Sequence, residues 1–90
     1  MTRRPRERSI EDYLGAVRRM LRAAARRVAG ADEWELAELI ALQSDLDDAI
    51  AQAVAGQREL GGKSWSAIAD GAGVKRQTAH ERWSGVTYEL

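Results

Sequence analysis

Apolar residues recur every three or four positions along two long stretches of the chain, and this spacing is typical of helices. The first stretch runs from Ile10 to Val28 and the second from Leu36 to Leu60. Such spacing places apolar side chains on one face of an α-helix. No stretch alternates apolar and polar residues as a half-buried strand does. The sequence therefore predicts an all-α fold.

Glycines and capping residues indicate where the two long helices end. Gly30 is a suitable stop for a helix over residues 10–29. Asp32 and Glu35 have the spacing of a capping box, which predicts the start of a second, longer helix. Gly56 falls inside that helix, and we expect the helix to bend or end there, because glycine destabilises a helix interior by about 1 kcal/mol relative to alanine.

The net charge of zero is an average over regions of opposite charge. Residues 1–30 carry a charge of +6, residues 31–60 carry −7 and residues 61–90 carry +1. A basic helix is thus followed by an acidic one. We expect the two to pack antiparallel as an N-terminal helical hairpin.

The length and composition of the chain set further limits. Ninety residues suffice for one domain with one core, and we expect residues 9–90 to form it. Residues 1–8 hold Pro5 among charges and no apolar residue after Met1, so they are predicted to be a flexible basic arm. The absence of cysteine excludes disulfides and thiolate metal sites. Neither a signal peptide nor a run of ~18 apolar residues is present, which predicts a cytoplasmic protein with no membrane partner.

The stretch SWSAIADGAGVKRQTAHERW, residues 64–83, has a different pattern, with two short helical segments separated by a glycine. Ser64 is suited to cap the first segment, Gly73 to adopt a positive φ in the turn, and Gly85 to end the second segment. Small and apolar residues stand where two crossing helices would meet. The predicted core of this motif, including its turn glycine, is Trp65, Ile68, Ala69, Gly73, Val74, Ala79 and Trp83.

These residues resemble the helix-turn-helix family of DNA-binding proteins. The resemblance is closest to small regulators of actinobacteria and their phages that carry W-[ST]-x-I-A-x-x-x-G-V-x-R-Q-x-A-x-x-R-[FW] after a long helix. It implies a helix-turn-helix at residues 64–84, with a recognition helix over residues 75–83 that enters the major groove of double-stranded DNA. The chain departs from the family at Lys75, where serine or threonine often caps the helix, and at Gly71, where a better helix former is usual. The implied function is site-specific DNA binding that represses or modulates transcription at the nucleoid.

The resemblance also implies roles for individual residues. Arg76 is suited to guanine O6 and N7, and Gln77 to adenine N6 and N7. Glu81 is expected to accept from cytosine N4 or to orient Arg76 or Arg82. The predicted base-reading residues are Arg76, Gln77, His80 and Glu81, and the predicted phosphate-contacting residues are Lys63, Ser64, Lys75, Thr78 and Arg82.

Arginines near the N-terminus extend this interpretation. We expect the arm to follow the DNA backbone or enter a minor groove through Arg3, Arg4, Arg6 and Arg8. The arginines of the first helix are Arg18, Arg19, Arg22, Arg26 and Arg27. Three uses are open for them, namely ion pairs with the acidic helix, phosphate contacts or a solvated face. Ion pairing is favoured. The apolar stripes of the two long helices predict a homodimer, because a dimer spaces two recognition helices one turn of DNA apart.

Other interpretations are open at this point. The charges of residues 75–82 are compatible with a solvated face, and Trp65 and Trp83 with stacking platforms for unpaired bases. The chain is also compatible with a protein-interaction module that binds a partner through the acidic helix, such as an antitoxin, an accessory or a DNA-packaging subunit. A further alternative is a non-specific architectural DNA-binding protein that binds mainly through the arm. With one histidine, His80, and no glycine-rich phosphate loop, the sequence predicts no enzyme, no metal and no cofactor.

Overall fold

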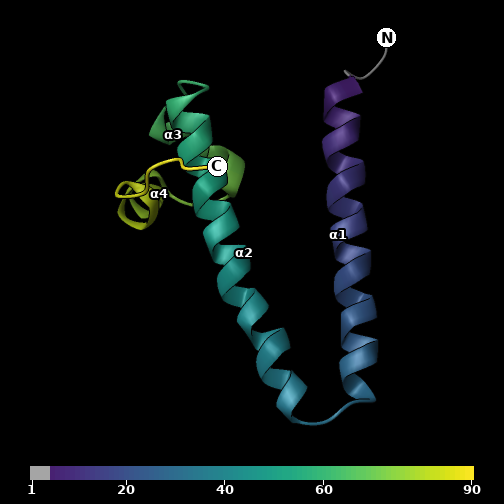
Figure 1. The fold of residues 1–90 in the computed structure, drawn as a ribbon. Coiled ribbons are helices and arrows are strands. Elements are labelled where there is room, and N and C mark those ends of the chain that lie inside the picture. Colours follow the sequence, from purple (N-terminus) through teal and green to yellow (C-terminus); the bar gives the residue numbers. More distant parts are fainter. Residues whose placement is uncertain (1–4) are drawn as a thin grey trace. The chain divides into compact units, whose positions relative to one another are not determined.

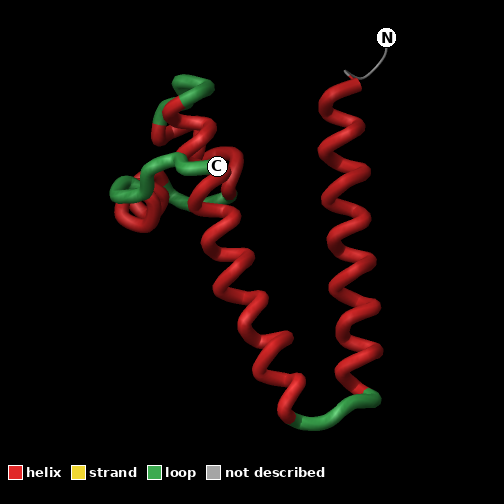
Figure 2. The backbone as a smooth tube through the Cα atoms, in the orientation of Figure 1, coloured by secondary structure: helices red, strands yellow, loops and turns green. Residues whose placement is uncertain are grey.

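The computed structural model describes the backbone of residues 5–90 and the side chains of residues 9–90. Over residues 5–90 the chain forms four helices and no strand (Figures 1 and 2). The helices are α1 (Pro5–Ala29), α2 (Trp34–Glu59), α3 (Trp65–Ala72) and α4 (Arg76–Trp83). The predicted all-α fold is therefore confirmed for this part of the chain. None of these helices has both the length and the apolar character that a membrane span requires.

The chain divides into two compact units, and the boundary between them falls within α2. One unit ends at Leu42 and the other covers Gln43–Leu90. All the buried side chains among residues 9–90 belong to the second unit, beginning at Val54. A hairpin of the two long helices, and a core shared by both units, stay predictions.

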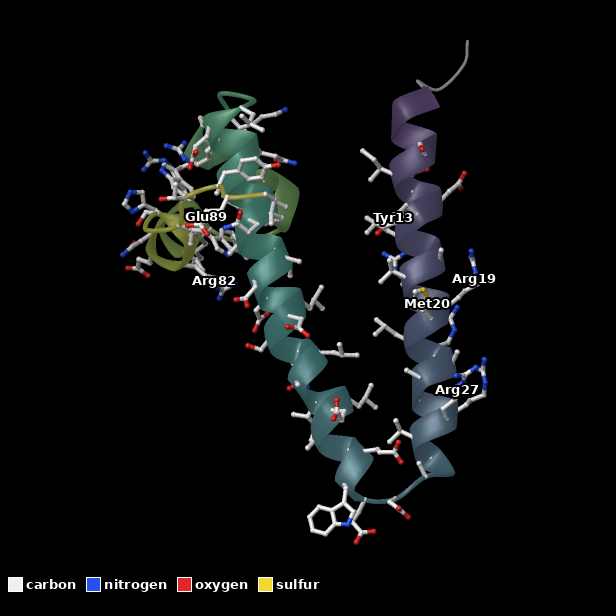
Figure 3. All side chains as sticks on the ribbon, in the orientation of Figure 1. Tyr13, Arg19, Met20, Arg27, Arg82 and Glu89 are labelled. Carbon is white, nitrogen blue, oxygen red and sulfur yellow. The ribbon has the colours of Figure 1, made fainter. Side chains whose placement is uncertain are left out.

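In the first unit, α1 begins at Pro5, five residues before the predicted start. Proline suits the first position of a helix, because the N–H that it lacks would have no partner there. The apolar stripe of α1 is largely exposed, with Tyr13 at 70% and Met20 at 65%. Tyr13 and Arg19 project from different sides of the helix (Figure 3). This helix is therefore amphipathic, and its apolar face is open within the described chain.

The link from α1 to α2 follows the predicted signals. α1 ends at Ala29, and the N–H of Gly30 donates to the carbonyl of Arg27 at 3.2 Å. The carboxylate of Glu35 accepts from the backbone N–H of Asp32 at 3.4 Å, which is the reach-back half of the expected capping box. Trp34, the first residue of α2, is 78% exposed.

In the second unit, α2 continues through Gly56 to Glu59, so the helix does not end at Gly56. Gly56 is buried, and the ring of Tyr88 lies against it. Gly62 then takes a φ of 65°, a left-handed conformation that glycine adopts without strain. This turn redirects the chain toward α3.

Residues 86–90 form neither helix nor strand and lie against α2, and we term them the C-terminal strap. The side-chain amide of Gln52 donates to the carbonyl of Thr87 at 2.9 Å and accepts from the N–H of Glu89 at 2.7 Å. The carboxylate of Glu59 accepts from the N–H of Tyr88 at 3.0 Å. The strap is thus held to α2 by side chains that replace the partners its backbone would have in a sheet.

Candidate nucleic-acid interface

The sequence encodes both ends of α3 locally. The hydroxyl of Ser64 accepts from the N–H of Ala67 at 3.1 Å, as an N-cap residue does. At the other end Gly73 has a φ of 72°, and the N–H of Val74 donates to the carbonyl of Ala69 at 3.0 Å. This pair of features is a Schellman motif, which turns the chain sharply after the helix. Ser64 and Gly73 therefore have the local roles that their types indicate.

The next helix, α4, begins without a side-chain cap. Lys75 occupies the N-cap position and makes no capping hydrogen bond, as its departure from the family pattern implies. The helix covers Arg76–Trp83, one residue shorter than predicted. Ser84 lies at its C-terminal end in a right-handed conformation. Gly85 directly follows this C-cap residue, as expected for the end of the segment, and its φ is not positive.

A small core joins α2, α3 and α4. Ala79 of α4 is fully buried, at 0% exposure, and Trp83 lies one turn further along. The core cluster is formed by Val54, Ile68, Ala69, Ala79 and Trp83, with Ala51, Trp65 and Val74 packed against it. The six non-glycine residues predicted as the motif core all belong to this set. Trp83 is buried and Trp65 half-buried, so Trp83 is not available as a stacking platform for unpaired bases.

The side of α4 opposite this core is exposed. Gln77 and Glu81 lie one helical turn apart, on the side opposite Ala79 and Trp83. The amide nitrogen of Gln77 donates to a carboxylate oxygen of Glu81 at 3.1 Å. The sequence led us to expect Glu81 beside Arg76 or Arg82, whereas the structure pairs it with Gln77. Arg76 is exposed at the first position of the helix.

His80 lies at the edge of this face and contacts another helix. Its ring meets that of Trp65 edge-on, with the ring centroids 5.2 Å apart. The guanidinium of Arg58 lies over Trp65, 4.2 Å from the ring centroid, and donates to the carbonyl of Lys63 at 2.9 Å. His80 and Trp65 also line a groove of about 350 Å³ beside α2. His80 is thus exposed but held on the flank of α4, away from the centre formed by Gln77 and Glu81.

The predicted phosphate-contacting residues are distributed around the two ends of α3 and along α4. Lys63, Ser64, Lys75 and Arg82 are exposed, and Thr78 is half-buried. The Ser64 hydroxyl is engaged in its cap. Arg82 lies with its guanidinium 5.6 Å from the centroid of the Trp83 ring and projects from α4 (Figure 3). It lines a second groove with Asp47 and Ile50 of α2. Lys63 and Lys75 are therefore the least engaged of the five.

The predicted DNA-binding arm falls mostly outside the described residues. Arg3 and Arg4 lie outside them altogether, and so do the side chains of Arg6 and Arg8. The backbone at positions 6 and 8 belongs to α1. The use of these arginines stays a prediction.

Sequence reasoning missed the residues that fasten the strap, namely Gln52, Gly56, Glu59 and Tyr88. One signal was present, since a glycine inside a strongly periodic helix often marks a close approach of another group. We interpreted Gly56 as a bend or an end of the helix. Arg58, which stacks on Trp65, was also missed, because nothing in the local pattern separates it from the other exposed arginines.

Comparison with protein-family models, with curated proteins and with solved structures gives no match to this chain. The interpretation of this interface therefore depends on its own geometry and chemistry.

Proposed function

We propose that the chain binds double-stranded DNA at specific sites through α4 and thereby represses or modulates transcription. The observation that carries this proposal is the division of α4 into two sides. Ala79 and Trp83 fix one side in the core, the opposite side presents Gln77 and Glu81 to solvent, and Arg76 is exposed at the first position of the helix. A recognition helix needs this division, because its buried side sets the angle of entry while its exposed side reaches base edges.

The chemistry of the exposed side suits the major groove. Arginine pairs with the two acceptors of guanine, and glutamine with the donor and acceptor of adenine. Lys63 and Lys75 stand near the starts of α3 and α4, where they suit contacts to phosphates on either side of the groove. Phosphate contacts position a protein on DNA, and base contacts select the sequence. Variants can therefore separate the phosphate-contacting residues, which affect affinity, from the base-contacting residues, which affect sequence preference.

We propose further that two copies of the chain bind together. The apolar faces of α1 and of the N-terminal part of α2 are exposed, including Tyr13, Met20 and Trp34. The arginines of residues 18–27 and the carboxylates of residues 32–48 have opposite charge, so α1 of one copy complements α2 of another. Two recognition helices in such a dimer would read half-sites roughly 34 Å apart.

Selection of random duplex DNA by the purified protein at near-physiological salt tests this function. The wild type should enrich a palindromic motif, and Arg76→Ala should lose the base preference at one position in each half-site. Gln57→Ala is the control, because the Gln57 side chain is exposed on α2 and is assigned neither to DNA nor to the dimer. Absence of an enriched motif, or a motif indifferent to Arg76→Ala, would overturn the proposal.

A second candidate function is a protein-interaction module that acts through α2. The observation in its favour is the exposed apolar and acidic surface near the start of that helix, which includes Trp34, Glu35 and Glu38. Light scattering separates this candidate from the dimer. A concentration-independent mass near 10.0 kDa, together with absence of DNA selection, would favour a partner of another kind on this surface.

A further inference from the structure

The pairing of Gln77 with Glu81 determines how the exposed side of α4 can read a base pair. We infer that Glu81 is a positioning residue for Gln77, and that the two together select adenine in the major groove of duplex DNA. This inference rests on the proposed DNA-binding function and adds to it a base identity at one position and a residue that imposes it.

The first step in the argument is the chemistry of the hydrogen bond. The Gln77 nitrogen lies 3.1 Å from a Glu81 carboxylate oxygen. An ionised carboxylate only accepts hydrogen bonds, so the amide group must turn its NH₂ end, and not its carbonyl, toward Glu81. Without such a partner an exposed glutamine presents either end with nearly equal ease. Glu81 therefore fixes the orientation of the Gln77 amide.

The second step is what this orientation leaves free. One N–H of Gln77 is donated to Glu81, while the second N–H and the carbonyl oxygen remain available. Adenine presents N7 as an acceptor and its N6 amino group as a donor in the major groove. The free donor and acceptor of Gln77 match these two groups. Guanine presents two acceptors, N7 and O6, so it would leave the Gln77 carbonyl facing an acceptor.

The third step is position. Gln77 and Glu81 are four residues apart in a helix whose buried positions are Ala79 and Trp83, so both lie at the centre of the exposed side. His80 lies on one flank of that side, and Thr78 and Arg82 lie on the other, while the spacing places Arg76 beside Trp83 at the first position of the helix. The N-terminal residues of a recognition helix contact the base edges, and Gln77 is the second residue of α4. The pair thus stands where a base contact has the largest effect on selectivity.

Two substitutions of Glu81 separate its charge from its hydrogen bond. Glu81→Asp keeps the negative charge, but its shorter side chain does not reach the Gln77 amide. Glu81→Gln keeps the length but removes the charge and no longer requires an NH₂ group opposite it. Asp70→Asn is the matched control for charge, because Asp70 is exposed on α3 and is assigned neither to DNA nor to the dimer. All these positions are exposed, and circular dichroism checks that each variant keeps its helix content.

The experiment measures binding to duplexes carrying the motif that the wild type selects. The position read by Gln77 is defined as the one at which Gln77→Ala loses its preference, and the duplexes carry each of the four base pairs there. We expect wild type to prefer adenine by at least about fivefold. Both Glu81 variants should reduce this preference to less than about twofold, whereas Asp70→Asn should retain it. Affinity for non-specific DNA should be unchanged in Glu81→Asp.

The failures of the inference and of the proposed function differ. A selected motif with no adenine at the position lost in Gln77→Ala, or with its adenine preference intact in both Glu81 variants, overturns the inference and leaves DNA binding in place. Absence of any selected motif overturns both.

Discussion

The aromatic ring of Tyr88 lies so close to Gly56 that a Cβ atom on residue 56 would be 3.0 Å from the Tyr88 Cε1 atom. A contact of this length would force the ring to move. Glycine at position 56 lowers the stability of the helix, but its lack of a side chain lets the Tyr88 ring cover the backbone of α2. Two residues 32 positions apart in the sequence therefore determine together how the strap lies on α2.

We predict that Gly56→Ala has opposite effects in two backgrounds. In wild type the new methyl group displaces Tyr88, so the free energy of unfolding should fall. In a Tyr88→Ala background the ring is absent, and the same substitution should raise the free energy of unfolding by up to about 1 kcal/mol through helix propensity. Urea denaturation of the four proteins measures the coupling. Equal effects in both backgrounds would show that the ring does not occupy this site in solution.

Gln52 should control the exchange of one amide proton in the strap. Gln52→Ala removes the acceptor of the Glu89 N–H, so the Glu89 amide should exchange with solvent faster. Because the bond is exposed, global stability should change by only about 0.5–1 kcal/mol. Hydrogen exchange followed by NMR tests this. Gln57→Ala is the matched control, since the Gln57 side chain is exposed on the same helix, and it should leave the Glu89 amide unaffected.

Enlarging Ala79 should destabilise the second unit strongly. Ala79 has no exposed surface, so Ala79→Leu forces a larger side chain into a filled space, and we expect a loss of about 1–3 kcal/mol. Ala53→Leu makes the same change at an exposed position of α2 and should alter stability by less than about 0.5 kcal/mol. Thermal unfolding followed by circular dichroism compares them. Similar losses in the two variants would contradict the described core.

The starts of α3 and α4 should respond in opposite directions to capping changes. Ser64→Ala removes a cap hydrogen bond and should cost about 1 kcal/mol. Lys75→Ser adds a hydroxyl where no cap bond exists and should stabilise by a comparable amount. The second variant should also bind DNA more weakly at low salt, because it removes a cation assigned to phosphate contact. Denaturant unfolding and a salt titration of DNA binding measure the two effects separately.

The sequence was most informative where its signals are local. The cap at Ser64, the left-handed turn at Gly73 and the spacing of Ala69, Val74 and Ala79 all act within a few residues of one another. For this reason the two short helices and their shared core agree with the sequence-based prediction. The exposed positions of Gln77 and Glu81 follow from the same spacing.

The prediction failed where a distant contact decides the local structure. Gly56 carries the local signal of a weak helix, but the ring that explains it comes from Tyr88. The bond between Gln77 and Glu81 had the correct spacing for prediction, but Arg76 and Arg82 offered stronger charges as partners for Glu81.

The strap also imposes an order on the synthesis of the second unit. The ribosome makes Gly56 well before Tyr88, and at typical rates of elongation the interval is roughly two to six seconds. During that interval the face of α2 around Gly56 has no aromatic cover, and Gln52 and Glu59 have no backbone groups of the strap to bind. The second unit therefore completes its fold only after residues 87–89 have emerged, so a nascent chain halted before them would carry α3 and α4 without the strap.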